Sequence, residues 1–145
     1  MRKLSAYYVF PISSAPLPFG IIETEDDGTI ARIVDTGGRI KESSRLEFYP
    51  GILIPGIVYE AIVPQGPNEA CRFILNSHRT DPGKPLNKIL RILTWDAAMK
   101  ISKGNSLGSL ETGKKPGIQW IDNLDLENMM LTEKSTLRDL IAPGY

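Results

Sequence analysis

The chain has 145 residues, and its 17 lysines and arginines balance its 17 aspartates and glutamates. This length corresponds to one domain and is too short for a (β/α)₈ barrel, which typically needs about 250 residues. Without net charge the chain has no general attraction for a polyanion, so nucleic acid and anionic membranes are poor candidates as partners.

The composition also bears on the compartment. No run of about 18 apolar residues could span a bilayer, and Ser5 and Pro11 interrupt the apolar stretch near the N-terminus before it could form a signal-peptide core. Cys71 is the single cysteine, so an internal disulfide is excluded and nothing indicates an oxidising environment. We therefore expect a cytoplasmic protein that does not contact membranes.

Residues 1–58 have the pattern of short strands. Apolar runs over residues 4–10, 19–24 and 29–34 are bounded by turn residues, and Asp26-Asp27-Gly28 is typical of a tight hairpin between the second and third runs. One or two further strands are expected over residues 45–54. Short strands at this spacing favour a small sandwich or a rolled antiparallel sheet.

The centre of the chain changes character twice. Residues 59–85 form a connector rich in proline and glycine, with one short helix expected over residues 68–75. Residues 86–101 then have helical periodicity, and residues 86–104 are expected to form a helix that ends at Gly104.

This expected helix is apolar on two faces. One face carries every third or fourth residue from Leu86 to Ile101, and the roughly opposite face carries Ile92, Trp95 and Met99. A helix that is apolar on two sides is normally covered on two sides. We therefore expect Ile92, Trp95 and Met99 to form an interface, partly under the connector and mainly with a second copy of the chain in a symmetric homodimer.

Residues 105–145 return to strand patterns. A glycine-rich loop over residues 108–117 precedes strands expected at residues 118–121 and 136–141. The last run is too short to be stable alone, so it should join the sheet system of residues 4–10. The order of strands, helix and strands predicts a single α+β domain, mostly β, over residues 1–145.

Two segments resemble a known superfamily. Leu53-Ile54-Pro55-Gly56-Ile57-Val58, which ends a strand after the Asp-Asp-Gly-Thr-Ile hairpin, is similar to the entry to the catalytic barrel of the amidohydrolase (metal-dependent hydrolase) superfamily. Thr94-x-x-Ala97-Ala98, followed by residues 107–118 (LGSLETGKKPGI), is similar to the exit from that barrel. The resemblance covers about two thirds of the chain, although Gly117 stands where the family usually has Asp.

The resemblance implies a particular fold. In that superfamily the two ends of the chain form one small composite β-sandwich, and the barrel is inserted between them. Here only 27 residues separate Val58 from Leu86, against about 250 for a barrel. We therefore expect the composite domain alone, with one or two helices in place of the barrel.

The resemblance also implies which catalytic groups are missing. Hydrolysis in the family depends on divalent metals held by several His and carboxylate ligands. The family's His-x-His pair would fall on Ala61 and Val63, neither of which can bind a metal. His78 and Asp81 are weak metal candidates in the connector, and a Cys71–His78 nucleophile pair would need a helix running through Asn76 and Ser77. We expect no catalytic residue, no cofactor and no tightly bound metal.

Three interpretations of function follow. The first is a non-catalytic, amidohydrolase-derived domain that acts through protein association. The second is a structural subunit of a metal-dependent hydrolase acting on carbon–nitrogen bonds, with the barrel supplied by a partner chain. The third is an internal deletion without independent function.

Overall fold

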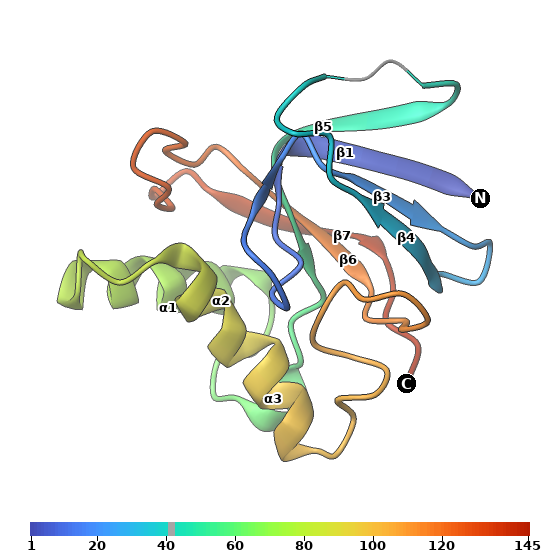
Figure 1. Cartoon of the computed structure of the whole chain (residues 1–145). Helices are drawn as coiled ribbons and strands as arrows, with labels where there is room; N and C mark the ends of the chain where they lie inside the picture. The colour runs from blue at the N-terminus through green and yellow to red at the C-terminus, as the bar shows by residue number, and fades with distance from the viewer. Residues whose placement is uncertain (41–42) are drawn as a thin grey trace.

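The computed structural model describes residues 1–40 and 43–145 as a small α+β domain (Figure 1). Its centre is a seven-stranded sheet in the order β4-β3-β1-β5-β6-β7, with β2 paired to the end of β1. The strands are β1 (Arg2–Val9), β2 (Leu17–Pro18), β3 (Ile21–Thr24), β4 (Ile30–Val34), β5 (Leu46–Pro55), β6 (Ile118–Asp122) and β7 (Thr136–Ile141). The first and last strands share one sheet, as predicted.

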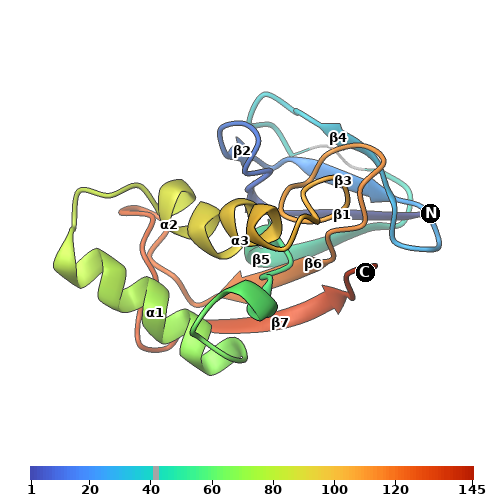
Figure 2. The same ribbon diagram turned by 90° about the horizontal axis from the view of Figure 1, so that it is seen from below.

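The described residues also form a 3₁₀ turn η1 (Tyr59–Ala61) and the helices α1 (Pro67–Thr80), α2 (Leu86–Leu93) and α3 (Trp95–Lys100). The helices gather together on one side of the sheet (Figure 2). Within the described ranges, no helix combines the length and apolar character needed to cross a membrane.

The hairpin between β3 and β4 is the one predicted at Asp26-Asp27-Gly28. Gly28 has a φ of 89°, in the left-handed region that glycine favours, and the N–H of Thr29 donates to Asp27 Oδ1 at 3.0 Å. Hydrogen bonds from Thr29 and from the Lys115 ammonium hold the pKa of the Asp27 carboxyl well below its usual range. Both aspartates therefore belong to the turn, where Asp27 is a structural acceptor.

β5 is one ten-residue strand that runs through Pro50 and Gly51, which is one of the two alternatives expected for residues 45–54. It corrects one expectation, because it is parallel to β1 and the sheet is therefore mixed instead of purely antiparallel. The parallel pair arises because β3 and β4 lie on the far side of β1, and the chain then crosses back to β1's other edge. The register of the β1–β5 pair shifts between Ala6 and Tyr8, opposite Pro50 and Gly51 of β5.

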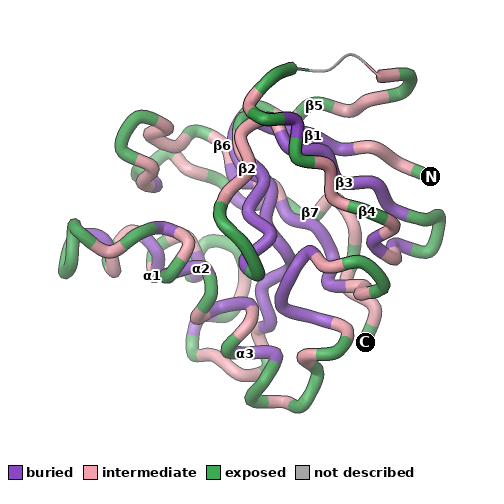
Figure 3. The backbone as a smooth tube through the Cα atoms, viewed as in Figure 1, coloured by how far each residue is buried: buried purple, intermediate pink, exposed green. Residues whose placement is uncertain are grey.

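The core lies on both faces of the sheet, because successive strand side chains point to opposite faces. Ile52 and Ile54 of β5 pack in one cluster with helical residues such as Ile74 and Leu90. Leu53 lies in a second cluster that includes Leu110 of the loop before β6. Figure 3 shows the buried part of the chain following the central strands.

Two helix predictions were wrong in their bounds. The short helix expected at residues 68–75 continues to Thr80, because Ile74 and His78 both turn inward to buried positions. The helix expected over residues 86–104 is interrupted at Thr94, whose φ and ψ are −120° and −81°, and its second part ends at Lys100. The buried Thr94 hydroxyl donates to the Leu90 carbonyl oxygen at 2.8 Å, a back-bond that bends helices.

Candidate functional site

The positions where the resemblance would put metal ligands lie at the end of η1. Ala61 closes this 3₁₀ turn, and Val63 is 92% exposed just beyond it. Neither side chain carries a ligand atom. Among residues 1–40 and 43–145, no three His, Cys, Asp or Glu side chains are grouped so that they could hold a metal ion.

His78 and Asp81 are not brought together. His78 lies in the last turn of α1, only 3% exposed, with its Nε2 3.0 Å from the carbonyl oxygen of Lys84. Asp81 is exposed and ends α1, where its N–H donates to the Ser77 carbonyl oxygen at 3.0 Å. The two residues line different hollows, and Asp81 has the role of a helix-terminating turn residue.

Cys71 lies on α1 two turns before His78, about 10 Å along the helix axis. The helix does run through Asn76 and Ser77, as a Cys–His pair would need, but that separation is too long for a hydrogen bond. Burial, together with the charge of Asp122, raises the pKa of the Cys71 thiol. The cysteine is therefore a protonated thiol at neutral pH and a poor nucleophile.

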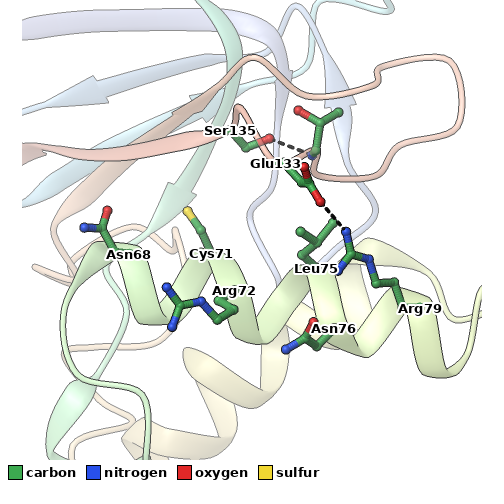
Figure 4. Close-up of a pocket in the computed structure, with 9 residues that line it drawn as sticks. Asn68, Cys71, Arg72, Leu75, Asn76, Arg79, Glu133 and Ser135 are labelled. Atoms are coloured by element: carbon green, nitrogen blue, oxygen red, sulfur yellow. Dashed lines mark hydrogen bonds and ion pairs between the residues drawn. The ribbon is translucent and has the colours of Figure 1, made fainter.

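A polar cavity of about 400 Å³ lies between α1 and the loop that joins β6 to β7 (Figure 4). Arg79 reaches across it from the helix and its Nη2 donates to Glu133 Oε1 at 2.9 Å. Opposite the helix, Ser135 Oγ accepts the Thr132 N–H at 2.9 Å. Because Arg79 and Glu133 are 58% and 80% exposed, their ion pair is worth less than about 1 kcal/mol.

Sequence reasoning did not single out this cavity. The available signal was the spacing of Asn68, Arg72, Asn76 and Arg79 by three and four residues, which places polar groups along one side of α1. Among the described residues that line the cavity, Cys71 supplies the thiol and no imidazole accompanies it.

The predicted interface residues lie on α2 and α3. Met99 is 58% exposed, whereas Ile92 and Trp95 are half-buried. Two cations flank the Trp95 ring: the Arg91 guanidinium lies 5.2 Å and the Lys114 ammonium 5.0 Å from its centroid. The stripe is thus partly covered by this chain's own side chains, and its role as an interface remains a prediction.

The site residues therefore divide into two groups. His78, Asp81 and Cys71 have structural surroundings, whereas Ile92 and Trp95 are half-buried and Met99 is exposed. Comparison of the chain with protein-family models, with curated proteins and with solved structures found no match.

Proposed function

We propose that this chain is a non-catalytic domain of amidohydrolase descent that acts in the cytoplasm by associating with a second copy of itself. The surface that would pair consists of Ile92, Trp95 and Met99. The proposed descent from amidohydrolases and the proposed association with a second copy are supported by different observations.

The descent is supported by where the two resembling segments lie. β5 and β6 pair antiparallel, so Pro55 is opposite Ile118 and the proposed barrel entry adjoins the proposed exit. The β3–β4 hairpin and the loop of residues 108–117 are also joined: the Ile30 N–H donates to the Lys114 carbonyl oxygen, and the Gly113 N–H to the Ile30 carbonyl oxygen, both at 2.9 Å. Such adjacency is what a composite domain requires of segments that are far apart in sequence.

The side chains at the expected ligand positions support the absence of catalysis. Ala61 and Val63 occupy the positions where the family has its first two histidine ligands, and a hydrolytic metal centre needs at least three ligands. We expect purified protein to bind no stoichiometric zinc and to hydrolyse no amide or imide. Saturable zinc-dependent hydrolysis that is lost in His78→Ala would overturn this part of the proposal.

The association is supported by one observation, the exposure of three apolar side chains on α2 and α3: Met99 is exposed, and Ile92 and Trp95 are only half-buried. Full burial of a large apolar side chain is worth about 1.5–3 kcal/mol. A twofold contact would bury the exposed parts of all three residues on both copies at once. A second copy carries the same apolar side chains, so a twofold contact would place apolar groups against apolar groups.

Light scattering at tens of micromolar tests the dimer. We expect a mass of two chains for the wild type and for Val63→Glu, and a mass of one chain for Met99→Glu. Val63→Glu is the matched control, because it makes the same kind of change at an exposed apolar residue outside the surface. A monomeric wild type, or a dimer in Met99→Glu, contradicts the proposal; Trp95→Glu, checked for folding by circular dichroism, should behave like Met99→Glu.

A second candidate function is favoured by the surroundings of Val63. This 92% exposed residue borders a largely apolar hollow of about 340 Å³, together with Pro64 and Phe73, at the place where a barrel would join. Under this reading the chain is a structural subunit of a carbon–nitrogen hydrolase whose barrel lies on another chain. Co-expression with a barrel chain that has His-x-His but no flanking strands should then give zinc-dependent hydrolysis that Val63→Glu reduces and Met99→Glu does not.

A further inference from the structure

A hollow of about 310 Å³ lies where three neighbouring strands of the sheet, β1, β5 and β6, come together. Tyr7 lines it from β1, Pro50 from β5, and Trp120 and Asp122 from β6. None of its lining residues lines the cavity between α1 and the β6–β7 loop, and none belongs to the proposed surface on α2 and α3. The hollow is therefore a separate feature of the sheet.

Another wall of the hollow comes from the start of the β6–β7 loop. Asn123 has a φ of 55°, in the left-handed region that asparagine tolerates, and the chain leaves the sheet there. Leu124 and Leu126, both half-buried, then line the hollow. Apart from the Asp122 carboxylate and the Asn123 amide, the side chains of the lining are therefore apolar or aromatic.

The two aromatic rings of the lining are held in fixed orientations. Nε1 of Trp120 donates to the Pro50 carbonyl oxygen at 2.9 Å. The Tyr7 ring, which is 37% exposed, meets Phe19 and Phe48 edge-on, with ring centroids 6.1 and 5.3 Å from its own. Because these contacts are made within the protein itself, the rings are already in place for a ligand.

Asp122 is the one charged residue among the described residues that line the hollow. Its Oδ1 accepts hydrogen bonds from the Thr136 hydroxyl and the Asn123 amide. Within residues 1–40 and 43–145, its Oδ2 accepts no hydrogen bond and the carboxylate has no ion-pair partner. A half-buried carboxylate without a counter-charge attracts a cation.

The chain around Asp122 adds further negative charge. Asp125 and Glu127 follow it, and residues 119–131 contain no lysine or arginine. Arg138 is the opposing charge: its guanidinium lies over the Trp120 ring, 5.4 Å from the centroid, but it does not line the hollow. The segment that borders the hollow is therefore acidic and disfavours an anionic ligand.

We propose that this hollow binds a small organic amine in its cationic form, with the ammonium group attached to an apolar body. The ammonium would donate to Asp122 Oδ2, and the apolar body would lie against Pro50 between Tyr7 and Trp120. β1 and β6 are two strand spacings apart, about 10 Å, so a molecule with one ring and a short arm is long enough to reach from Tyr7 to Asp122. This inference does not depend on the association proposed above.

Two probes with the same ring and arm test it on the wild-type chain. Benzylamine is positively charged at pH 7, and benzyl alcohol is neutral. We expect benzylamine to bind in the millimolar range and about tenfold or more tightly than benzyl alcohol, because only the ammonium forms a charged hydrogen bond with the carboxylate. Equal affinity for the two probes, or no binding of benzylamine at about 20 mM, would overturn the proposal.

The two indole N–H signals in the NMR spectrum report where the probe binds. Trp120 lines the hollow, whereas Trp95 lies on α3 and outside it. Benzylamine should therefore shift the Trp120 signal and leave the Trp95 signal in place. A shift of the Trp95 signal alone would overturn the proposal.

A variant pair completes the experiment. Asp122→Asn keeps the shape of the side chain and an acceptor for Thr136 but removes the charge, so it should weaken benzylamine by about tenfold and leave benzyl alcohol unchanged. Asp81→Asn makes the same change at an exposed carboxylate outside the hollow and should change neither. Unaltered benzylamine affinity in Asp122→Asn, or an equal loss in Asp81→Asn, would contradict the assignment.

Discussion

Gly51 is the residue of β5 that can least accept a side chain. Its φ is +133°, and a Cβ built there would collide with the carbonyl oxygen of Ile121 on β6. We predict that Gly51→Ala lowers the free energy of unfolding by more than about 1 kcal/mol, measured by urea denaturation. Gly83→Ala is the control: a Cβ there meets nothing closer than 3.7 Å, so its effect should stay within about 0.5 kcal/mol. Similar losses in both variants would contradict the argument.

Through Glu47, the free energy of unfolding should depend on pH in the acid range. Its carboxylate accepts hydrogen bonds from Arg2 Nε at 3.0 Å, Arg2 Nη2 at 2.7 Å and the Tyr49 hydroxyl at 2.7 Å. The Arg2 hydrogen bonds, with the smaller help of Tyr49, lower the pKa of Glu47 below its ordinary value of 4.5. The stabilisation is therefore present above that pH and is lost as the pH falls through the lower, folded-state value.

Glu47→Gln removes this contribution. Because the pair is about one third exposed, we expect the wild type to lose only about 0.5–1 kcal/mol through this group between pH 6 and pH 2. Urea midpoints measured across that range should fall less steeply for Glu47→Gln than for the wild type. Parallel slopes would show that Glu47 does not contribute.

At the scale of elements, the strands were easier to predict than the helices. The bounds of β7 agree with the predicted run of residues 136–141, which ends just before the turn residues Pro143 and Gly144. The break at Thr94 was missed because it depends on one buried hydroxyl, which periodicity does not register. Helical periodicity likewise missed the last turns of α1, where polar residues surround the buried His78.

β7 is an edge strand on which the fold depends. It pairs with β6 along its length, places Leu137 in the core at 5% exposure, and packs against α1. Deleting residues 135–145 should therefore abolish cooperative thermal unfolding, because it uncovers β6 and one side of α1 together. Removing Tyr145 alone, whose hydroxyl bonds the exposed Glu60, should leave the transition nearly unchanged. A truncated chain that melts like the full one would contradict this prediction.

At the scale of the whole molecule, the sequence predicted the α+β fold class but not which strands pair in the sheet. The pattern of apolar and polar residues in a strand indicates which side chains are buried, but it does not show which strand lies next to it. The parallel pairing of β1 with β5 could therefore not be predicted from the sequence. The same holds for the hollow that His78 and Asn87 line, because its walls come from α1, α2 and a distant loop and are brought together only by the fold.

The two halves of the chain should reassemble when separated. Residues 1–63 hold β1 to β5, and residues 64–145 hold the three helices, β6 and β7. Each half leaves a sheet edge unpaired and a core face uncovered, so neither should fold alone. Both tryptophans, Trp95 and Trp120, lie in the second fragment, so its fluorescence should become native-like only after the first is added. A native-like spectrum of the second fragment alone would contradict the prediction.

The opposition of Pro55 and Ile118 in the β5–β6 pair has a further consequence. Everything between these residues leaves the sheet and returns to it at one point, so its ends are held together whatever its length. Loop-closure entropy rises only with the logarithm of length, by about 0.6 kcal/mol for each doubling. The sheet can therefore accept a much longer insertion at this point with little added cost in loop-closure entropy, whereas residues 56–117 cannot be lost, because α1 and α2 cover Ile52 and Ile54.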